Sequence, residues 1–171
     1  MACFLLLLFS AWQFEWPYIR VRGAPVDPAF AASRWEMVHQ AVAALGRGTE
    51  NTLFYETTPL LYLNYSTIAF QDYVDGLPPP RAATGALITD LEEQRRRLAQ
   101  ADIVFAPTPD AYGEFPQLPT ASSAFRAKMI DLIESTGRFG PAIRIADPLR
   151  GGAVLLYKGL HPSVSSSGRK G

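Results

Sequence analysis

The sequence predicts a small three-layer α/β domain, with a mainly parallel sheet, a C-terminal antiparallel hairpin and an apolar, membrane-type helix before it. Two observations lead to this prediction. Between residues 29 and 160, runs of β-branched and aromatic residues alternate with helical segments, which is typical of βαβ units in a parallel sheet. Residues 2–9 read ACFLLLLF and carry no charge, and aromatic residues follow them.

Composition narrows the class of protein. The 171 residues suit one domain of ordinary size. Lys plus Arg and Asp plus Glu both number 16, so no net field favours nucleic acid, and we predict no nucleic-acid partner. The only cysteine is Cys3, which excludes a disulfide within the chain and a cysteine-based metal cluster.

The N-terminal apolar run has three interpretations. A signal peptide usually has a positive charge before its apolar run and a small-x-small cleavage site, and both are missing. A run of this length is also common in a buried core. We favour the end of a transmembrane helix over residues 1–19, because aromatic side chains gather where a helix leaves the bilayer. The aromatic residues are Trp12, Phe14, Trp16 and Tyr18, and Pro17 would end the helix.

On this interpretation the helix starts upstream, and Met1 is an internal methionine of a longer chain. Residues 20–28 form a linker rich in proline and glycine, residues 29–160 form the α/β domain, and residues 161–171 form a Ser/Gly-rich tail that we expect to be disordered.

Helical spacing of apolar residues predicts the first helix of the domain, which ends at Gly46 and Gly48. Residues 52–57 (TLFYET) are typical of a strand. Residues 60–70 (LLYLNYSTIAF) fit a short helix or an extended segment equally well. The run 75–85 (DGLPPPRAATG) is predicted to be loop.

The second half of the domain gives clearer signals. Thr89 and Glu92 match a capping box before a charged helix, and residues 103–106 form a short strand before a proline-rich loop over 107–119. A helix is expected over residues 122–135. Residues 142–146 and 153–157 are expected to form a hairpin, because Gly151 and Gly152 favour a tight turn.

Motifs for cofactors and metals are not found. Gly46-Arg47-Gly48 follows a helix instead of opening one, which favours a helix cap over a phosphate loop, and no GxSxG motif occurs. His39 and His161 lack metal-ligand spacing to other ligands. We therefore expect no cofactor and no metal. Asn64-Tyr65-Ser66 matches a glycosylation sequon and is interpreted as accidental, while residues 95–97 (RRR) are interpreted as a solvated face.

Carboxylates that follow strands are the candidates for catalysis, because sites in α/β proteins gather at the carboxyl ends of strands. Glu56 ends the first strand and Asp110 follows the second; Glu114 and Asp147 lie in similar places. Two such carboxylates could act as a general acid and base, although acids in loops are more often simply solvated.

The layout resembles the C-terminal soluble domain of polytopic membrane glycosyltransferases of the mannosyltransferase and aminoarabinose-transferase type, which use lipid-linked sugar donors. The resemblance covers most of residues 12–160. It rests on the aromatic helix exit, the strand TLFYET with the Tyr-rich LYLNYS, the strand ending ADIVFAP, the helix AFRAKMIDLIESTGRF and the hairpin IRIADPLRGGAVLLYKG. The family's catalytic acids lie in a region that these residues do not match, so the resemblance assigns no catalytic residue here.

The resemblance implies an accessory domain on the extracytoplasmic side of a bacterial inner membrane. Such a domain would be attached through the N-terminal segment, would contact a lipid-linked sugar or its acceptor, and would not be catalytic alone. Two alternatives stay open: a secreted or periplasmic binding module, and a small α/β enzyme that uses Glu56 and Asp110 at the sheet edge.

Overall fold

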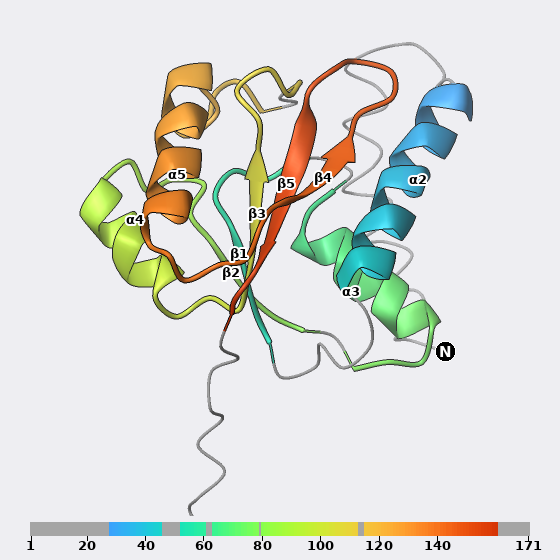
Figure 1. The fold of residues 1–171 in the computed structure, drawn as a ribbon. Coiled ribbons are helices and arrows are strands. Elements are labelled where there is room, and N and C mark those ends of the chain that lie inside the picture. Colours follow the sequence, from blue (N-terminus) through green and yellow to red (C-terminus); the bar gives the residue numbers. More distant parts are fainter. Residues whose placement is uncertain (1–27, 46–51, 61–62, 79, 113–114, 161–171) are drawn as a thin grey trace, which may run out of the picture. The chain divides into compact units, whose positions relative to one another are not determined.

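The structure is a computed structural model, which describes residues 28–45, 52–60, 63–78, 80–112 and 115–160. The chain divides into two units, residues 1–32 and residues 33–171, and the sheet and its helices, apart from helical residues 28–32, belong to the second unit. In the described residues, four helices and five strands alternate for most of the chain, and the last two strands are consecutive (Figure 1). The predicted α/β class is therefore confirmed.

One mixed sheet has the strand order β2-β1-β3-β5-β4. Strand β1 (Leu53–Glu56) pairs in parallel with β2 (Arg81–Thr84) and with β3 (Ile103–Pro107). Strand β5 (Ala153–Lys158) pairs antiparallel with both β3 and β4 (Ile143–Ala146). The predicted C-terminal hairpin is confirmed, but a sheet with two parallel and two antiparallel pairings is mixed, not mainly parallel.

Helices cover both faces of this sheet (Figure 1). Helices α2 (Pro28–Leu45) and α3 (Tyr65–Val74) share one buried cluster with the sheet, in which Phe54 and Phe105 stack with ring centroids 5.6 Å apart. Helices α4 (Leu91–Leu98) and α5 (Ser123–Ser135) share the other cluster, which includes Tyr55, Val104 and Tyr157. The alternation of strand side chains between the faces therefore separates two cores.

Side-chain caps fix where three of the helices begin. Asn64 caps α3 by accepting from the N–H groups of Ser66 and Thr67, and the Thr67 hydroxyl accepts from the Asn64 N–H, which completes a capping box. Asp90 caps α4 and Ser122 caps α5. The sequon asparagine therefore has a structural role at the start of α3.

Two predictions about local structure are corrected, and one alternative that the sequence left open is resolved. The expected loop at 75–85 contains β2, a short and mostly exposed edge strand with little apolar patterning. The ambiguous segment 60–70 is divided, since helix α3 begins only at Tyr65. The cap of α4 is Asp90 rather than Thr89, so Glu92 lies in the first turn without closing the predicted capping box.

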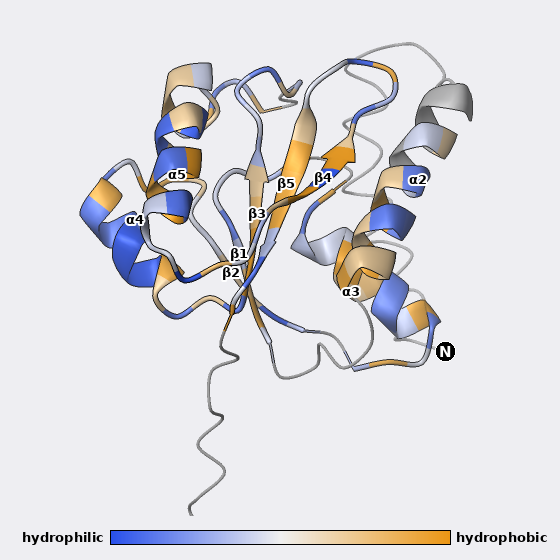
Figure 2. Ribbon diagram, viewed as in Figure 1, coloured by the Kyte–Doolittle hydropathy of each residue, from blue (hydrophilic) through white to orange (hydrophobic). Residues whose placement is uncertain are grey.

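The strands inside the fold and the helices that cover them differ in hydropathy (Figure 2). Strands β3, β4 and β5 are largely hydrophobic, whereas α4 is mostly hydrophilic. On α4, Glu93 lies 2.6 Å from Arg96 and 2.7 Å from Arg97 in ion pairs, which confirms the predicted solvated face. The predicted apolar helix, the tail and the linker lie outside the described residues, except for Pro28 of the linker, which begins α2. Among the helices that are described, none is both long and apolar enough to cross a bilayer.

Candidate functional site

The carboxyl ends of β1 and β3 lie side by side, and the segments that follow these two strands lead to helices on opposite faces of the sheet. The helix after β1, α3, packs on one face of the sheet, whereas α4 and α5, which follow β2 and β3, pack on the other. In open α/β sheets, ligands bind in the crevice outside such a switch point, because neighbouring loops there diverge to opposite faces. This edge is therefore the candidate site.

Glu56, the last residue of β1, lies at this edge. Its side chain is buried, with 6% of its surface exposed, and one carboxylate oxygen accepts a hydrogen bond from the backbone N–H of Tyr65. Burial raises the pKa of Glu56 to about 7, and the bond from Tyr65 opposes that rise without cancelling it. A carboxyl group that titrates near neutral pH is thus positioned against the first turn of α3.

Buried threonines hold the loops around Glu56 in place. Thr57 donates to the carbonyl of Phe105, which ties the end of β1 to β3. Thr58 donates to the carbonyl of Thr120 at 2.9 Å, and Thr120 donates to the carbonyl of Ala86 at 2.8 Å. These bonds join the loops after β1 and β2 to the segment that precedes α5. Because every one of these threonines is buried, the edge is a fixed framework.

Asp110, the second predicted candidate, lies in the loop after β3 and is exposed. A hydrogen bond with the Thr108 side chain, the Asp110 backbone N–H and the charge of Arg144 hold the pKa of Asp110 below its usual range. In the described residues no contact joins Asp110 to Glu56. The prediction that these acids share one edge of the sheet agrees with the strand directions, but the structure does not pair them as an acid and a base.

The loop after β3 is held down by several contacts. Arg126, a buried residue in the second turn of α5, donates to the carbonyl of Ala111. The guanidinium of Arg150 lies 4.0 Å from the ring centre of Tyr112. Gly152, with φ of 72°, lies so close to Ala111 that a Cβ atom there would be 2.4 Å from the Ala111 Cα. The loop is therefore tied to both α5 and the β4–β5 turn.

The remaining predicted candidates have structural roles or are not described. Asp147 accepts from the N–H groups of Leu149 and Arg150, and so shapes the β4–β5 turn. His39 is exposed on α2, with its ring 6.3 Å from that of Trp35. Glu114 and His161 lie outside the described residues. In the part of the chain that is described, no group of three or more His, Cys, Asp or Glu side chains could hold a metal ion.

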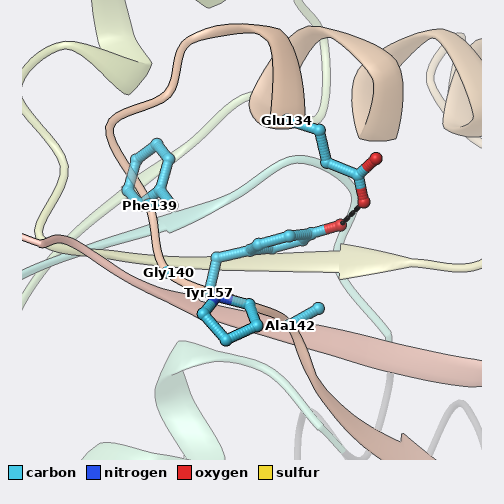
Figure 3. Close-up of a pocket in the computed structure, with 6 residues that line it drawn as sticks. Glu134, Phe139, Gly140, Ala142 and Tyr157 are labelled. Atoms are coloured by element: carbon cyan, nitrogen blue, oxygen red, sulfur yellow. Dashed lines mark hydrogen bonds between the residues drawn. The ribbon is translucent and has the colours of Figure 1, made fainter.

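A second feature, which the sequence did not predict, is a pocket of 240 Å³ lined by the end of α5, residues 139–142 and Tyr157 of β5 (Figure 3). The Tyr157 hydroxyl donates to the Glu134 carboxylate at 3.0 Å, and Phe139 contacts Tyr157 edge to face. Burial and the bond to Glu134 raise the pKa of Tyr157, so its hydroxyl stays protonated.

Comparisons with known proteins add no assignment. No family model, no curated protein and no solved structure matches the chain.

Proposed function

We propose that residues 29–160 form an accessory domain of a membrane-attached, glycosyltransferase-like protein, on the extracytoplasmic side of the membrane. The domain is not catalytic alone. It binds the sugar part of a lipid-linked donor or of the acceptor at the carboxyl edge of β1 and β3. The resemblance in layout motivates the choice of ligand, and the position of Glu56 motivates the choice of site.

The observation that carries the proposal is a buried carboxyl at the switch point of the sheet. Glu56 is 6% exposed, yet its chemistry is not that of a core residue. Carboxyl groups bind sugar hydroxyls well, because they accept hydrogen bonds when ionised and can also donate one when protonated. The threonine bonds around Glu56 keep the neighbouring loops fixed, which reduces the entropy lost on binding.

A ligand titration tests the binding site. The full chain, labelled with nitrogen-15 and held in detergent micelles, is titrated with a mannosyl phosphate that carries a short prenyl chain. The Tyr65 amide, which bonds to Glu56, and the Gly85 amide, which donates to the Glu56 carbonyl at 2.7 Å, should shift together and saturate. Glu56→Gln should weaken the binding, whereas Asp110→Asn, at the same edge but exposed, should not.

Two results would contradict this proposal. One is a titration in which neither the Tyr65 nor the Gly85 amide moves. The other concerns attachment: if the full chain stays in the aqueous fraction with vesicles and without detergent, the domain is not membrane-attached.

The pKa of Glu56 supports a second candidate, a small α/β enzyme. A carboxyl with a pKa of about 7 is matched to general acid–base work near neutral pH. In this case Glu56→Gln abolishes an activity of the isolated chain while the fold persists. The enzyme could use Glu56 alone or Glu56 together with Asp110. Asp110→Asn distinguishes these two mechanisms, because only the second requires Asp110.

A further inference from the structure

Helix α3 carries an apolar stripe on its outer side. Phe70, Tyr73 and Val74 lie at the spacing that places side chains on one helical face, and Leu77 follows shortly after the helix ends at Val74. Their exposed fractions are 54%, 76%, 59% and 37%. On the inner side of the same helix are Ile68 and Asp72, both buried. A surface helix normally turns its charged face outward, so an aromatic outer face needs an explanation.

Helix α2 extends this stripe. Trp35 is 43% exposed, and its ring centre lies 6.3 Å from that of Phe70. Helices α2 and α3, with the turn after α3, therefore expose one group of apolar side chains, formed by Trp35, Phe70, Tyr73, Val74 and Leu77. We call it the aromatic surface. Large exposed apolar surfaces of this kind mark places where a protein meets another apolar body.

We propose that the aromatic surface lies in the interfacial region of a lipid bilayer, so that the α2/α3 layer faces the membrane. This inference rests on the membrane attachment in the proposed function. Tryptophan and tyrosine rings favour the interface between hydrocarbon and water, because each ring is apolar and carries one polar group.

The position of the aromatic surface along the chain agrees with this occupant. The apolar and aromatic segment ends at Tyr18, and α2 begins at Pro28. An extended linker of this length reaches at most about 35 Å, at roughly 3.5 Å per residue. For a chain anchored through its first residues, this reach puts the start of α2 within about 35 Å of the bilayer, so that the aromatic surface can contact it.

The distribution of charge between the α2/α3 layer and the α4/α5 layer also agrees with lipid contact by α2 and α3. Helix α4, on the opposite face of the sheet, carries Glu92, Glu93 and three arginines, and it is the most hydrophilic helix in Figure 2. Contact of the α2/α3 layer with lipid would leave this charged layer in water. Between Phe70 and Leu77 the only charged residues are Asp72 and Asp75, and Arg34 and Glu36, which flank Trp35 in the sequence, are of opposite sign. The surface therefore suits zwitterionic lipids and gains nothing from anionic ones.

Tryptophan quenching tests this orientation in the full chain. The chain has three tryptophans, and replacing Trp12 and Trp16 by phenylalanine leaves Trp35 as the single reporter. The chain is mixed with phosphatidylcholine vesicles, with or without bromine near the top of the acyl chains, and then floated. We expect the chain to float and the brominated lipid to quench Trp35. Adding phosphatidylserine should not increase the quenching.

A matched pair of variants ties the signal to the aromatic surface. Phe70→Ser with Tyr73→Ser should lower the quenching to the value seen without bromine. The control is Leu87→Ser with Leu149→Ser, which replaces two exposed leucines elsewhere (75% and 52% exposed) and should leave the quenching unchanged. Circular dichroism of both variants checks that they fold; if the first does not, Tyr73→Ser alone replaces it and should reduce the quenching.

The outcomes separate the two proposals. If the chain floats and Trp35 is not quenched, the attachment stands and the membrane-facing orientation is wrong. If Trp35 is shielded from bromine while the chain sediments as a dimer, the aromatic surface binds a second copy, which also overturns the inference. If the chain does not float at all, both the attachment and the orientation are wrong.

Discussion

The Glu56 carboxylate accepts a hydrogen bond from the backbone N–H of Tyr65, and this bond joins the last residue of β1 to the first turn of α3. A carboxylate at a helix N-terminus is favourable, since it satisfies an amide that the helix leaves unpaired. Burial still dominates and raises the pKa of Glu56 from 4.5 to about 7. Glu56 therefore stabilises the contact between β1 and α3 through its hydrogen bond, while its burial disfavours the ionised form of its own carboxyl group.

The first prediction concerns pH. Because the folded-state pKa of this acid is raised, the folded protein binds more protons than the unfolded chain between pH 4.5 and about 7. The Glu56 contribution is therefore fully present below pH 4.5 and lost as the pH rises through 7. The shift corresponds to about 3 kcal/mol.

Glu56→Gln isolates that contribution, because glutamine keeps an oxygen that can accept from Tyr65. Urea unfolding should show the variant more stable than the natural chain at pH 8 by up to about 3 kcal/mol, with the difference vanishing near pH 4.5. Asp110→Asn is the exposed control. A Glu56→Gln difference that does not change with pH would contradict the prediction.

The second prediction compares two neighbouring glycines in the β4–β5 turn. Gly151 and Gly152 have φ of 75° and 72°, but a Cβ at Gly151 would meet nothing within 4 Å, whereas one at Gly152 would clash with Ala111. Gly151→Ala should therefore lower the free energy of unfolding by about 1 kcal/mol, for the left-handed backbone alone. Gly152→Ala should lower it by clearly more, and equal losses would show that the loop after β3 is not packed against the turn.

The third prediction concerns Tyr55, whose hydroxyl donates to Gln94 at 2.6 Å in a fully buried pair. Tyr55→Phe removes the donor and leaves the Gln94 oxygen unsatisfied, which should lower the free energy of unfolding by about 1–3 kcal/mol. Gln94→Leu alone should also destabilise the fold, because its amide donates to the carbonyls of Gly85 and Ile88. In a double-mutant cycle, the losses of unfolding free energy from the two substitutions should be clearly non-additive. Additive losses would contradict an energetic coupling between Tyr55 and Gln94.

The fourth prediction tests the cap of α3. Asn64→Ala should lower the free energy of unfolding by about 1 kcal/mol, because it removes the acceptor for the amides of Ser66 and Thr67. Ser66→Ala destroys the same sequon and leaves the Asn64 cap intact, so thermal unfolding should be almost unchanged. Equal destabilisation by both variants would show that the Asn64 cap does not stabilise the start of α3.

The sequence was most informative where local chemistry alone decides the structure. The helix expected over residues 122–135 and the hairpin expected from the paired glycines at 151–152 correspond to α5 and to the β4–β5 hairpin. It failed at β2, because the segment RAAT is short, exposed at a sheet edge and preceded by prolines, which together look like a loop. The pattern Asn64-x-x-Thr67 could have located the start of α3, since it forms the capping box.

The burial of Glu56 could not be predicted, because it depends on where α3 packs after the chain leaves β1. Asp110 follows β3 in the same way and is exposed. The difference arises from tertiary packing: α3 begins against Glu56, while the loop that carries Asp110 lies against the β4–β5 turn. The aromatic surface was likewise hidden in the sequence, since an apolar stripe normally indicates the buried side of a helix.

The most direct test of the account is the titration of Glu56 itself. The carboxyl carbon of Glu56, labelled with carbon-13 in the full chain and assigned through Glu56→Gln, is followed by NMR from pH 3 to pH 9, roughly the range over which carboxyl groups and histidines titrate. A midpoint near the pKa of about 7 would agree with a buried carboxyl at the switch point. A midpoint near the ordinary value of 4.5 would mean that water reaches Glu56 freely, and would contradict both the binding site and the acid–base candidate.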